Sequence, residues 1–452
     1  MARERAAPRA LAPVSDGPKL RIANARVPLC LLEDDFADAG EQLALLDLDI
    51  EGGRISGISV AGSEPAPQHA ALIDQDGGQV WPGLIDLHTH LDKGHIWPRA
   101  ANSDGTFAAA LEAVRADREA NWSAEDVRAR FEFGLRCAWA HGTVAIRTHL
   151  DSPPPQHRIT WPLLRDLREE WSGRIALQAV SLVTLDDLRG AFAEELVDLI
   201  ANSGGVFGCV TFMAPDIDAQ LDRVFALAAE RGLDLDFHVD ETADVHATSL
   251  GHIAEAALRH RFAGKILCGH CCSLALQEPA EAERTLALVR EAGIAVVSLP
   301  LCNLYLMNRA PGRTPRWRGV TLLHEMAAQS IPVALASDNC RDPFYGYGDH
   351  DMLEVFREAV RIAHLDCPVG AWPAAVTRTP AEIMGLPERG VIRVGAPADL
   401  ILFRARYWSE LLSRPQLERL VLRAGRPIDR ALPDHRELDD VLARSSVAPA
   451  AG

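Results

Sequence analysis

The chain has 452 residues, which is long enough for one large domain and a smaller second one. Its formal net charge of −17 at pH 7 argues against nucleic-acid binding, because the phosphates would be repelled. No apolar run approaches the roughly 18 residues that a membrane-spanning helix needs, so we expect no membrane partner.

The first 17 residues are rich in Ala, Arg and Pro and lack the apolar core of a secretory signal. This composition predicts a disordered tail over residues 1–17. The nine cysteines are odd in number and form no pair of CxxC motifs. Reduced thiols are the simplest interpretation of this usage, and they predict a cytoplasmic protein.

Short apolar runs separated by Gly and Asp turns fill residues 18–80. A similar β-rich pattern returns near the C-terminus, in residues 391–440. We therefore expect the N- and C-terminal segments to form one small composite β-sandwich, with the main domain inserted between them.

Eight short β-branched or apolar runs alternate with helical patterns through residues 81–390. The runs are VWPGLIDLH (80–88), VAIRTHLD (144–151), IALQAVSL (175–182), VFGCVTF (206–212), LDLDFHVD (233–240), KILCGHC (265–271), AVVSLPL (295–301) and IPVALASD (331–338). Eight alternating βα units predict the α/β class and, within it, a catalytic (β/α)8 TIM barrel over residues 81–390.

Five of these runs lead into histidine or aspartate at their carboxyl ends, as HTH, RTHLD, HVDE, GHCC and SDN. Taken alone, the HTH pair fits surface histidines as well as metal ligands, although side chains at i and i+2 of a strand share one face. In a (β/α)8 barrel all the carboxyl ends of the strands open on the same face, where the chemistry lies. The five ends together therefore predict one site.

Three imidazoles and one carboxylate, those of His88, His90, His238 and Asp338, form a ligand set suited to Zn²⁺ or Fe²⁺. For Asp338 alone, a helix N-cap in the SDN turn is the structural alternative. A divalent ion there would lower the pKa of a bound water molecule, and Asp338 could accept that water's proton. The fourth run offers no lysine of the kind that bridges two metals in binuclear barrels, so we predict a single ion.

Two further residues near these ends are candidates for catalysis. A third, in the loop after the first run, is a candidate for an ion pair. Glu241 follows His238 by three residues and is placed to move protons over a substrate, although an acidic residue is also favoured at a helix start. His270 could stabilise a developing oxyanion, although an isolated histidine more often belongs to the core. We expect Lys93 to be a salt-bridge partner first and a substrate contact only second.

The ordered motifs HTHLDK, RTHLD, FHVDE, GHCCSLA, LPLCNLYL and SDNCRDPFYGYGDHDML make the chain resemble the amidohydrolase superfamily, and within it the cytosine deaminases. The likeness runs from about residue 80 to 395. It implies one divalent ion, Fe²⁺ or Zn²⁺, bound by His88, His90, His238 and Asp338. It also implies proton transfer by Glu241 and an orienting role for His270.

The resemblance further implies three substrate contacts. Gln178 matches a position that recognises the amide edge of a pyrimidine, and Phe344 matches an aromatic position beside the ring. Asn339 departs from the family pattern, because the cytosine deaminases of the closest kind carry a second aspartate there. The departure favours a related amino-azaheterocycle over cytosine itself.

We therefore expect a hydrolase that acts on non-peptide carbon–nitrogen bonds and releases ammonia from the C=N–NH2 group of cytosine or a related ring. Hydrolysis of a substituted aminotriazine or cyclic amide is the alternative within enzymes, and a non-catalytic metal-binding barrel is the alternative outside them. We expect a small heterocyclic substrate, no nucleic-acid or membrane partner, and a homo-oligomer.

Overall fold

A computed structural model describes residues 19–443, and the expected tail over residues 1–17 lies outside these described residues. The chain folds as two compact units. Unit 1 comprises Met1–Gly83, Asp366–Arg378 and Pro387–Arg430, and unit 2 comprises Leu84–Leu365, Thr379–Leu386 and Ala431–Gly452. Within the described part of the chain, every helix is too short or too polar to cross a bilayer.

Unit 1 holds two four-stranded sheets built from both ends of the sequence. The first sheet has the order β3-β2-β1-β4, with β1 Lys19–Pro28, β2 Leu43–Glu51, β3 Arg54–Val60 and β4 Ala71–Asp74. The second has the order β16-β15-β14-β5, with β5 Val80–Pro82, β14 Leu400–Leu402, β15 Leu420–Arg423 and β16 Arg426–Pro427. One apolar core joins residues of both sheets, as in the expected composite sandwich.

Unit 2 contains eight parallel strands within the described residues, and their pairing closes them into a ring. One sheet has the order β6-β7-β8 and the other β13-β12-β11-β10-β9. The bridges Thr89↔Asp338, Val180↔Val206 and Thr184↔Val210, all parallel, join the two sheets at both edges. The strands are β6 Leu84–Thr89, β7 Thr143–Asp151, β8 Ala176–Leu182, β9 Phe207–Val210, β10 Leu235–Val239, β11 Ile266–His270, β12 Ala295–Ser298 and β13 Val333–Leu335. The (β/α)8 barrel expected from the alternating runs is therefore confirmed.

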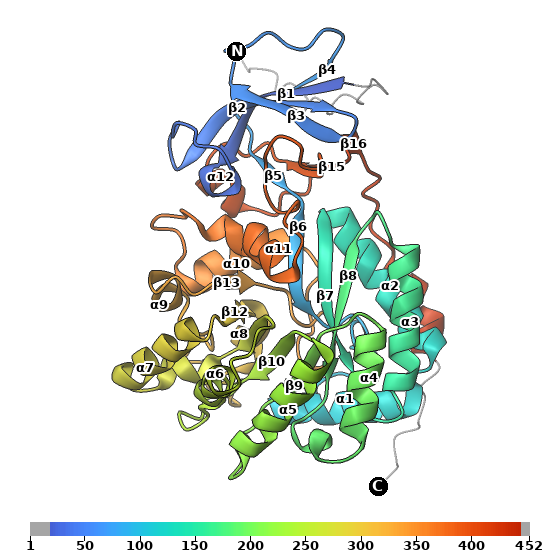
Figure 1. The fold of residues 1–452 in the computed structure, drawn as a ribbon. Helices are drawn as coiled ribbons and strands as arrows, with labels where there is room; N and C mark the ends of the chain where they lie inside the picture. Colours follow the sequence, from blue (N-terminus) through green and yellow to red (C-terminus); the bar gives the residue numbers. More distant parts are fainter. Residues whose placement is uncertain (1–18, 444–452) are drawn as a thin grey trace. The chain divides into compact units, whose positions relative to one another are not determined.

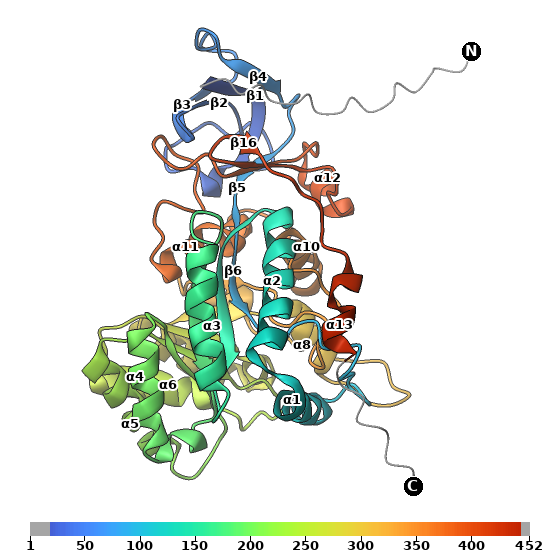
Figure 2. The same ribbon diagram turned by 90° about the vertical axis from the view of Figure 1, so that its right-hand side faces the viewer.

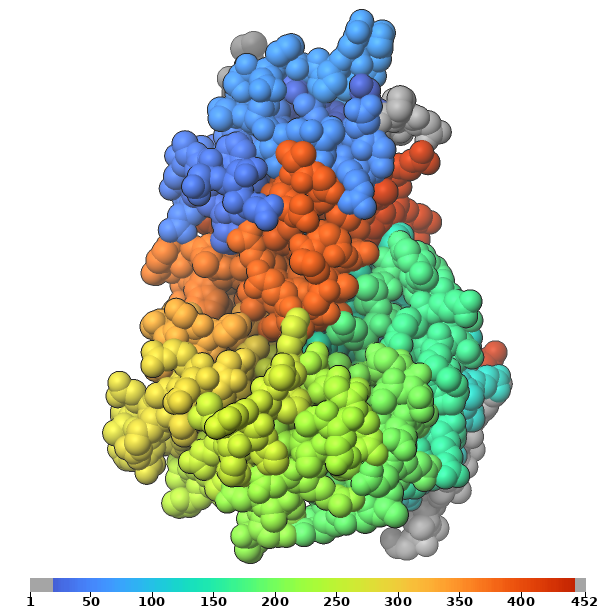
Figure 3. Space-filling view, viewed as in Figure 1, coloured from blue at the N-terminus to red at the C-terminus, as the bar shows by residue number. Residues whose placement is uncertain are grey.

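Helices cover the outside of this ring, and α2 and α3 lie side by side along β7 and β8 (Figures 1 and 2). In the space-filling view the green to yellow part of the chain, which carries α3 to α7, presents a continuous surface of side chains (Figure 3). The longer helices are α1 Phe107–Asn121, α2 Ala124–His141, α3 His157–Glu170, α4 Phe192–Asn202, α5 Ile217–Arg231, α6 Ser249–His260, α7 Pro279–Glu291 and α10 Met352–Ala363. The shorter ones are α8 Pro300–Leu306, α9 Leu323–Ala328, α11 Arg378–Met384, α12 Trp408–Ser413 and α13 Asp439–Leu442.

Local sequence signals explain where these helices begin and end. The hydroxyl of Ser123 accepts a hydrogen bond from the main-chain N–H of Asp126 at the start of α2. Gly142 then ends α2 with a φ of 101°, in the left-handed region that side chains disfavour. β7 begins at the next residue, so this turn sets the register in which β7 enters the barrel.

The expected first strand, 80–88, is two strands. β5 ends at Pro82 and pairs with β14 in unit 1, whereas β6 begins at Leu84 and pairs with β7 in unit 2. Pro82 has no N–H to donate to a ladder, and the N–H of Gly83 donates to Asp399 O rather than to a barrel strand. The apolar run is continuous, so periodicity alone could not reveal this change of sheet.

Candidate active site

Four side chains converge at the carboxyl ends of β6, β10 and β13. The Nε2 atom of His238 lies 3.1 Å from His88 Nε2 and 3.3 Å from His90 Nε2. The Oδ1 atom of Asp338 lies 3.2 Å from His90 Nε2 and 3.6 Å from His88 Nε2. Ligand atoms around a tetrahedral ion bound at about 2.0–2.2 Å are about 3.3–3.6 Å apart, so these spacings match a four-ligand site.

Main-chain hydrogen bonds hold the first and last strands of the ring at this point. The N–H of Asp338 donates to His88 O at 2.8 Å, and the N–H of His90 donates to Asp338 O at 3.2 Å. Asp338 adopts a φ of 63°, which is uncommon for a residue with a side chain. Strained positions of this kind persist where the surrounding structure enforces them, and they cluster at functional sites.

The protonation of the cluster suits a cation. Burial and the neighbouring imidazoles hold the pKa of His88 well below its usual value, and burial acts in the same direction on the pKa of His90 and of His238. The three rings are therefore neutral near pH 7, with lone pairs free for a ligand. Burial also raises the pKa of Asp338 to about 7, and among the described residues no N–H or O–H group donates to either of its oxygens. A divalent ion would accept the lone pairs of the three imidazoles and would stabilise the charge of the buried carboxylate. These residues therefore fit a divalent ion.

A second ion has no bridging ligand within the described residues of β9. That strand and the segment after it, Phe207 to Asp216, contain no lysine. The single ion stays a prediction, and it rests on this missing lysine.

Glu241 and His270 stand beside the cluster and share Asn303 as a partner. The Nδ2 atom of Asn303 donates to Glu241 Oε1 at 3.1 Å and lies 3.0 Å from His270 Nδ1. Burial lowers the pKa of His270 to about 3, so the ring is neutral. Because Nδ1 faces an amide donor, the ring proton is assigned to Nε2, which has no other partner among the described residues and can donate a hydrogen bond.

Glu241 has the electrostatics of a proton carrier. Burial raises the pKa of Glu241 well above its usual value, and the charge of Asp338 adds to this effect. A carboxyl with a raised pKa holds its proton closer to neutral pH, which is the range in which a general acid and base must work. Glu241 is not one of the four converging ligands, so it is free to perform this task.

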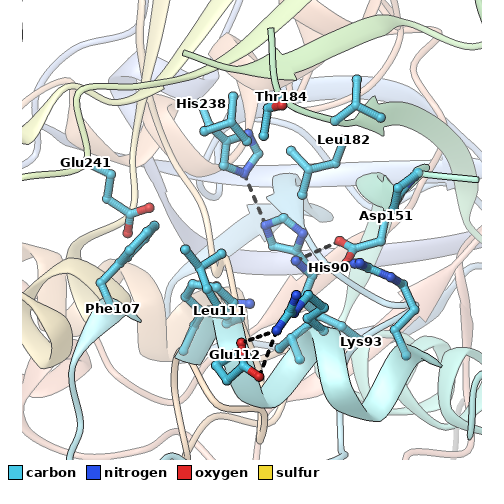
Figure 4. Close-up of a pocket in the computed structure, with 18 of the residues that line it drawn as sticks. His90, Lys93, Phe107, Leu111, Glu112, Asp151, Leu182, Thr184, His238 and Glu241 are labelled. Carbon is cyan, nitrogen blue, oxygen red and sulfur yellow. Dashed lines mark hydrogen bonds and ion pairs between the residues drawn. The ribbon is translucent and has the colours of Figure 1, made fainter. Parts of the chain in front are cut away.

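A cavity of about 520 Å³ opens over these groups (Figure 4). Its wall includes His90, His238, Glu241, His270 and Asp338 from the cluster, together with Phe107, Leu111, Arg118, Asp151, Thr184, Asn339 and Phe344. Phe107 and Phe344 pack edge to face, with ring centroids 5.5 Å apart. Two aromatic rings beside the polar centre suit a flat, aromatic ligand.

The expected substrate contacts divide into two groups. Phe344 and Asn339 line the cavity, and Asn339 Nδ2 donates to Asp342 Oδ2 at 2.7 Å. Gln178 does not line it. Its Oε1 accepts hydrogen bonds from Arg147, and its Nε2 donates to Met384 O at 2.7 Å.

The structure therefore places Gln178, the expected reader of the amide edge, away from this cavity. Gln178 is the third residue of β8 and pairs with Arg147, whereas the cavity opens beyond the end of that strand. Thr184, six residues further along the chain, is the one from this segment that reaches the cavity together with Leu182 and Val183. Gln178 was expected there from its match to a family motif, whereas depth along the strand decides which residue reaches the mouth.

The sequence reasoning also missed Asn303 and Phe107. Asn303 lies in LPLCN, as the fourth residue of α8 and five residues after the end of β12, so a search of strand ends alone does not reach it. Phe107 begins α1, after a long segment from the end of β6, and no strand-end signal marks it. Only the fold brings it to the cavity.

Comparisons with known proteins show which proteins the chain is similar to. The sequence profile of the Amidohydrolase family matches residues 195–429. A pterin deaminase of Rhizobium rhizogenes (strain K84 / ATCC BAA-868) is 56% identical over 422 residues, which cover 93% of this chain and 96% of the relative.

Two solved structures are also similar. The 5-methylcytosine deaminase from Klebsiella pneumoniae, liganded with 5-fluorocytosine, has a TM-score of 0.77 at 23% identity and covers 92% of this chain and 98% of its own. The N-isopropylammelide isopropylaminohydrolase from Burkholderia multivorans ATCC 17616 has a TM-score of 0.72 at 26% identity and covers 91% of this chain and 98% of its own.

Proposed function

Because the chain belongs to the amidohydrolase family, we propose that it is a metal-dependent hydrolase that removes the amino group of an aminoheterocycle, with a pterin-type ring as its substrate class. The observation that carries the proposal is the convergence of His88, His90, His238 and Asp338 beside a cavity that Glu241 and His270 also line. A binding scaffold has no use for the two proton-handling groups.

The ring class rests on two supports. A relative that is 56% identical over nearly the whole chain is a pterin deaminase, and the cavity of about 520 Å³ has room for a bicyclic ring. The substrate expected from the sequence was cytosine or a related amino-azaheterocycle, and pterin-type rings belong to the second group. Asn339, which departs from the cytosine deaminases, supports the related ring over cytosine itself.

When bound by His88, His90, His238 and Asp338, a divalent ion, Fe²⁺ or Zn²⁺, would supply Lewis-acid activation of a water molecule. The protein groups then divide the proton transfers. Asp338 accepts the proton that the attacking water loses, and Glu241 delivers a proton to the ring nitrogen beside the reacting carbon. His270 donates from Nε2 to the developing negative charge on oxygen.

The second half of the reaction breaks the bond between the ring carbon and the exocyclic nitrogen. The leaving amine takes a proton by way of Glu241 and departs as ammonia, and the ring keeps the oxygen of water as an oxo group. Phe107 and Phe344 hold the flat ring beside the centre and keep bulk water away from it.

An ammonia-release screen tests the proposal. Protein loaded with Fe²⁺ or Zn²⁺ is offered pterin, cytosine, isocytosine, 5-methylcytosine, isoguanine, creatinine and N-alkylaminotriazines. We expect pterin to give the highest kcat/KM and to release ammonia. Release of an alkylamine from the triazines as the main activity would favour the substituted-amine hydrolase instead, and no turnover of any compound by metal-loaded protein would contradict the enzyme.

A further inference from the structure

Lys93 is the one lysine among the residues that line the cavity, and the proton transfers above do not use it. It is one of three lysines in the chain, with Lys19 and Lys265, and it follows His90 in the loop after β6. Its side chain is only 5% exposed, yet it lines the cavity. Burying an ammonium group in a ligand cavity is costly unless a partner or a ligand compensates.

One partner fixes the position of the ammonium group. Lys93 Nζ lies 2.9 Å from Asp151 Oδ1, and the other oxygen of Asp151 accepts a hydrogen bond from Arg118 Nη1 at 2.7 Å. The main-chain N–H of Asp151 donates to Asp92 Oδ2, and this bond anchors the main chain of Asp151. Burial acts to lower the pKa of Lys93, but Asp151 and Asp92 outweigh it and hold the pKa above its usual value. The group therefore stays charged.

The ammonium group still has donors to spare. A lysine carries three N–H donors, and its ion pair with Asp151 uses one of them. Nζ also lies 5.3 Å from the centroid of the Phe344 ring, the same aromatic side chain that packs against Phe107. A flat ligand held beside Phe344 would therefore present its edge within reach of Nζ.

Polar side chains of the cavity wall could meet two opposite edges of such a ligand. Figure 4 shows Glu241 and Phe107 to the left of His90 and Asp151, the ion-pair partner of Lys93, to its right. When the reacting carbon of a planar ring sits over the centre, one neighbouring ring nitrogen faces Glu241. The opposite edge of the ring then faces Lys93.

The geometry points to Lys93 as a specificity-determining residue that donates a hydrogen bond to a ring oxo group on the edge opposite Glu241. This assignment rests on the proposed function and narrows its substrate class to amino-oxo heterocycles, in which the carbonyl stands next but one to the amine-bearing carbon. An ammonium donor to a carbonyl oxygen is a charge-assisted hydrogen bond, which is stronger than a neutral one. Rings without the oxygen leave the ammonium group without its acceptor.

A matched pair of ligands tests the assignment. Pterin carries the oxo group, and 2-aminopteridine is the same bicyclic amine without it. The dissociation constants of both are measured by stopped-flow ligand fluorescence, which reads binding before turnover, with metal-loaded wild type, Lys93→Met and Lys19→Met. Lys19 pairs with Glu51 in unit 1, outside the residues that line the cavity, so Lys19→Met is the control that leaves both constants unchanged.

We expect Lys93→Met to weaken pterin binding by about 10- to 100-fold, the range for a hydrogen bond to a charged group, and to change 2-aminopteridine binding by less than about 3-fold. Arg118 still pairs with Asp151 in this variant, which limits the cost to folding. If Lys93→Met does not fold, Lys93→Gln, which keeps a donor near Asp151 but removes the charge, is measured in its place. The same loss of preference for the oxo ligand is expected.

Equal weakening of both ligands would overturn the assignment, since it is the mark of a structural lysine. A wild-type protein that binds the two ligands equally would overturn it as well. The two proposals fail separately. If the protein releases ammonia but its preference for the oxo ligand does not depend on Lys93, only the role of Lys93 is removed. If that preference depends on Lys93 but no ammonia is released, only the deaminase proposal is removed.

Discussion

Replacing Glu241 by glutamine is expected to leave the divalent ion bound and to lower kcat by about 10²- to 10⁴-fold, the usual contribution of a general acid–base group. Glutamine keeps the shape of the side chain, and it can still meet Asn303, the partner that lies 3.1 Å from the glutamate. It cannot take up or deliver a proton. Steady-state kinetics on the best substrate, with metal analysis of the same preparation, measures both parts of the expectation.

Glu283→Gln is the matched control for this variant. Glu283 is exposed on α7, outside the residues that line the cavity, and its replacement should leave kcat and the ion content unchanged. Activity of Glu241→Gln within a few-fold of wild type would remove Glu241 from the mechanism. Loss of the ion from that variant would instead make Glu241 a ligand.

Replacing His238 by alanine is expected to remove the ion and the activity together. His238 Nε2 lies within 3.3 Å of both other histidine nitrogens, so its loss opens one side of the ligand set. Loss of a residue that merely orients a ligand costs about 10–100-fold in metal affinity, and loss of a ligand itself should cost more. Wild-type protein should carry one Fe²⁺ or Zn²⁺ per chain, and His238→Ala close to none, as measured by elemental analysis after desalting.

His246→Ala serves as the control, because His246 is exposed in the loop after β10 and lies outside the cluster. It should keep one ion and full activity. Two ions per chain in the fully active wild type would contradict the single-ion site. Full ion content in His238→Ala would show that the metal lies elsewhere.

Much of this site follows from one rule about strand ends. His88, His90, His238 and Asp338 are far apart in the sequence, but each stands at or just after the carboxyl end of a parallel strand. Closing the strands into a ring brings all such ends to one face, so counting the strands was enough to bring these four side chains together. The position of Asp338 just after β13 was enough to predict that it belongs to the site.

The substrate contacts required information that the pattern does not contain. Gln178 and Thr184 lie on the same segment, and only the register of β8 against β7 decides that Thr184 reaches the cavity while Gln178 bonds to Arg147. Phe107 reaches it from α1, at the far end of a long connection whose course is set by packing. The charge of Lys93 is known from the sequence. Its ion pair with Asp151 is not, because that contact depends on how the segments at the ends of β6 and β7 meet.

The measurement that tests hydrolytic deamination most directly follows the oxygen atom. Metal-loaded protein is incubated with pterin in water enriched in a heavy oxygen isotope, and the product is analysed by mass spectrometry alongside an ammonia assay. The account predicts one ammonia released per product, and a product whose new oxo group carries the heavy isotope on the carbon that held the amine. An unchanged pterin, or a product that keeps its amino group, would contradict it.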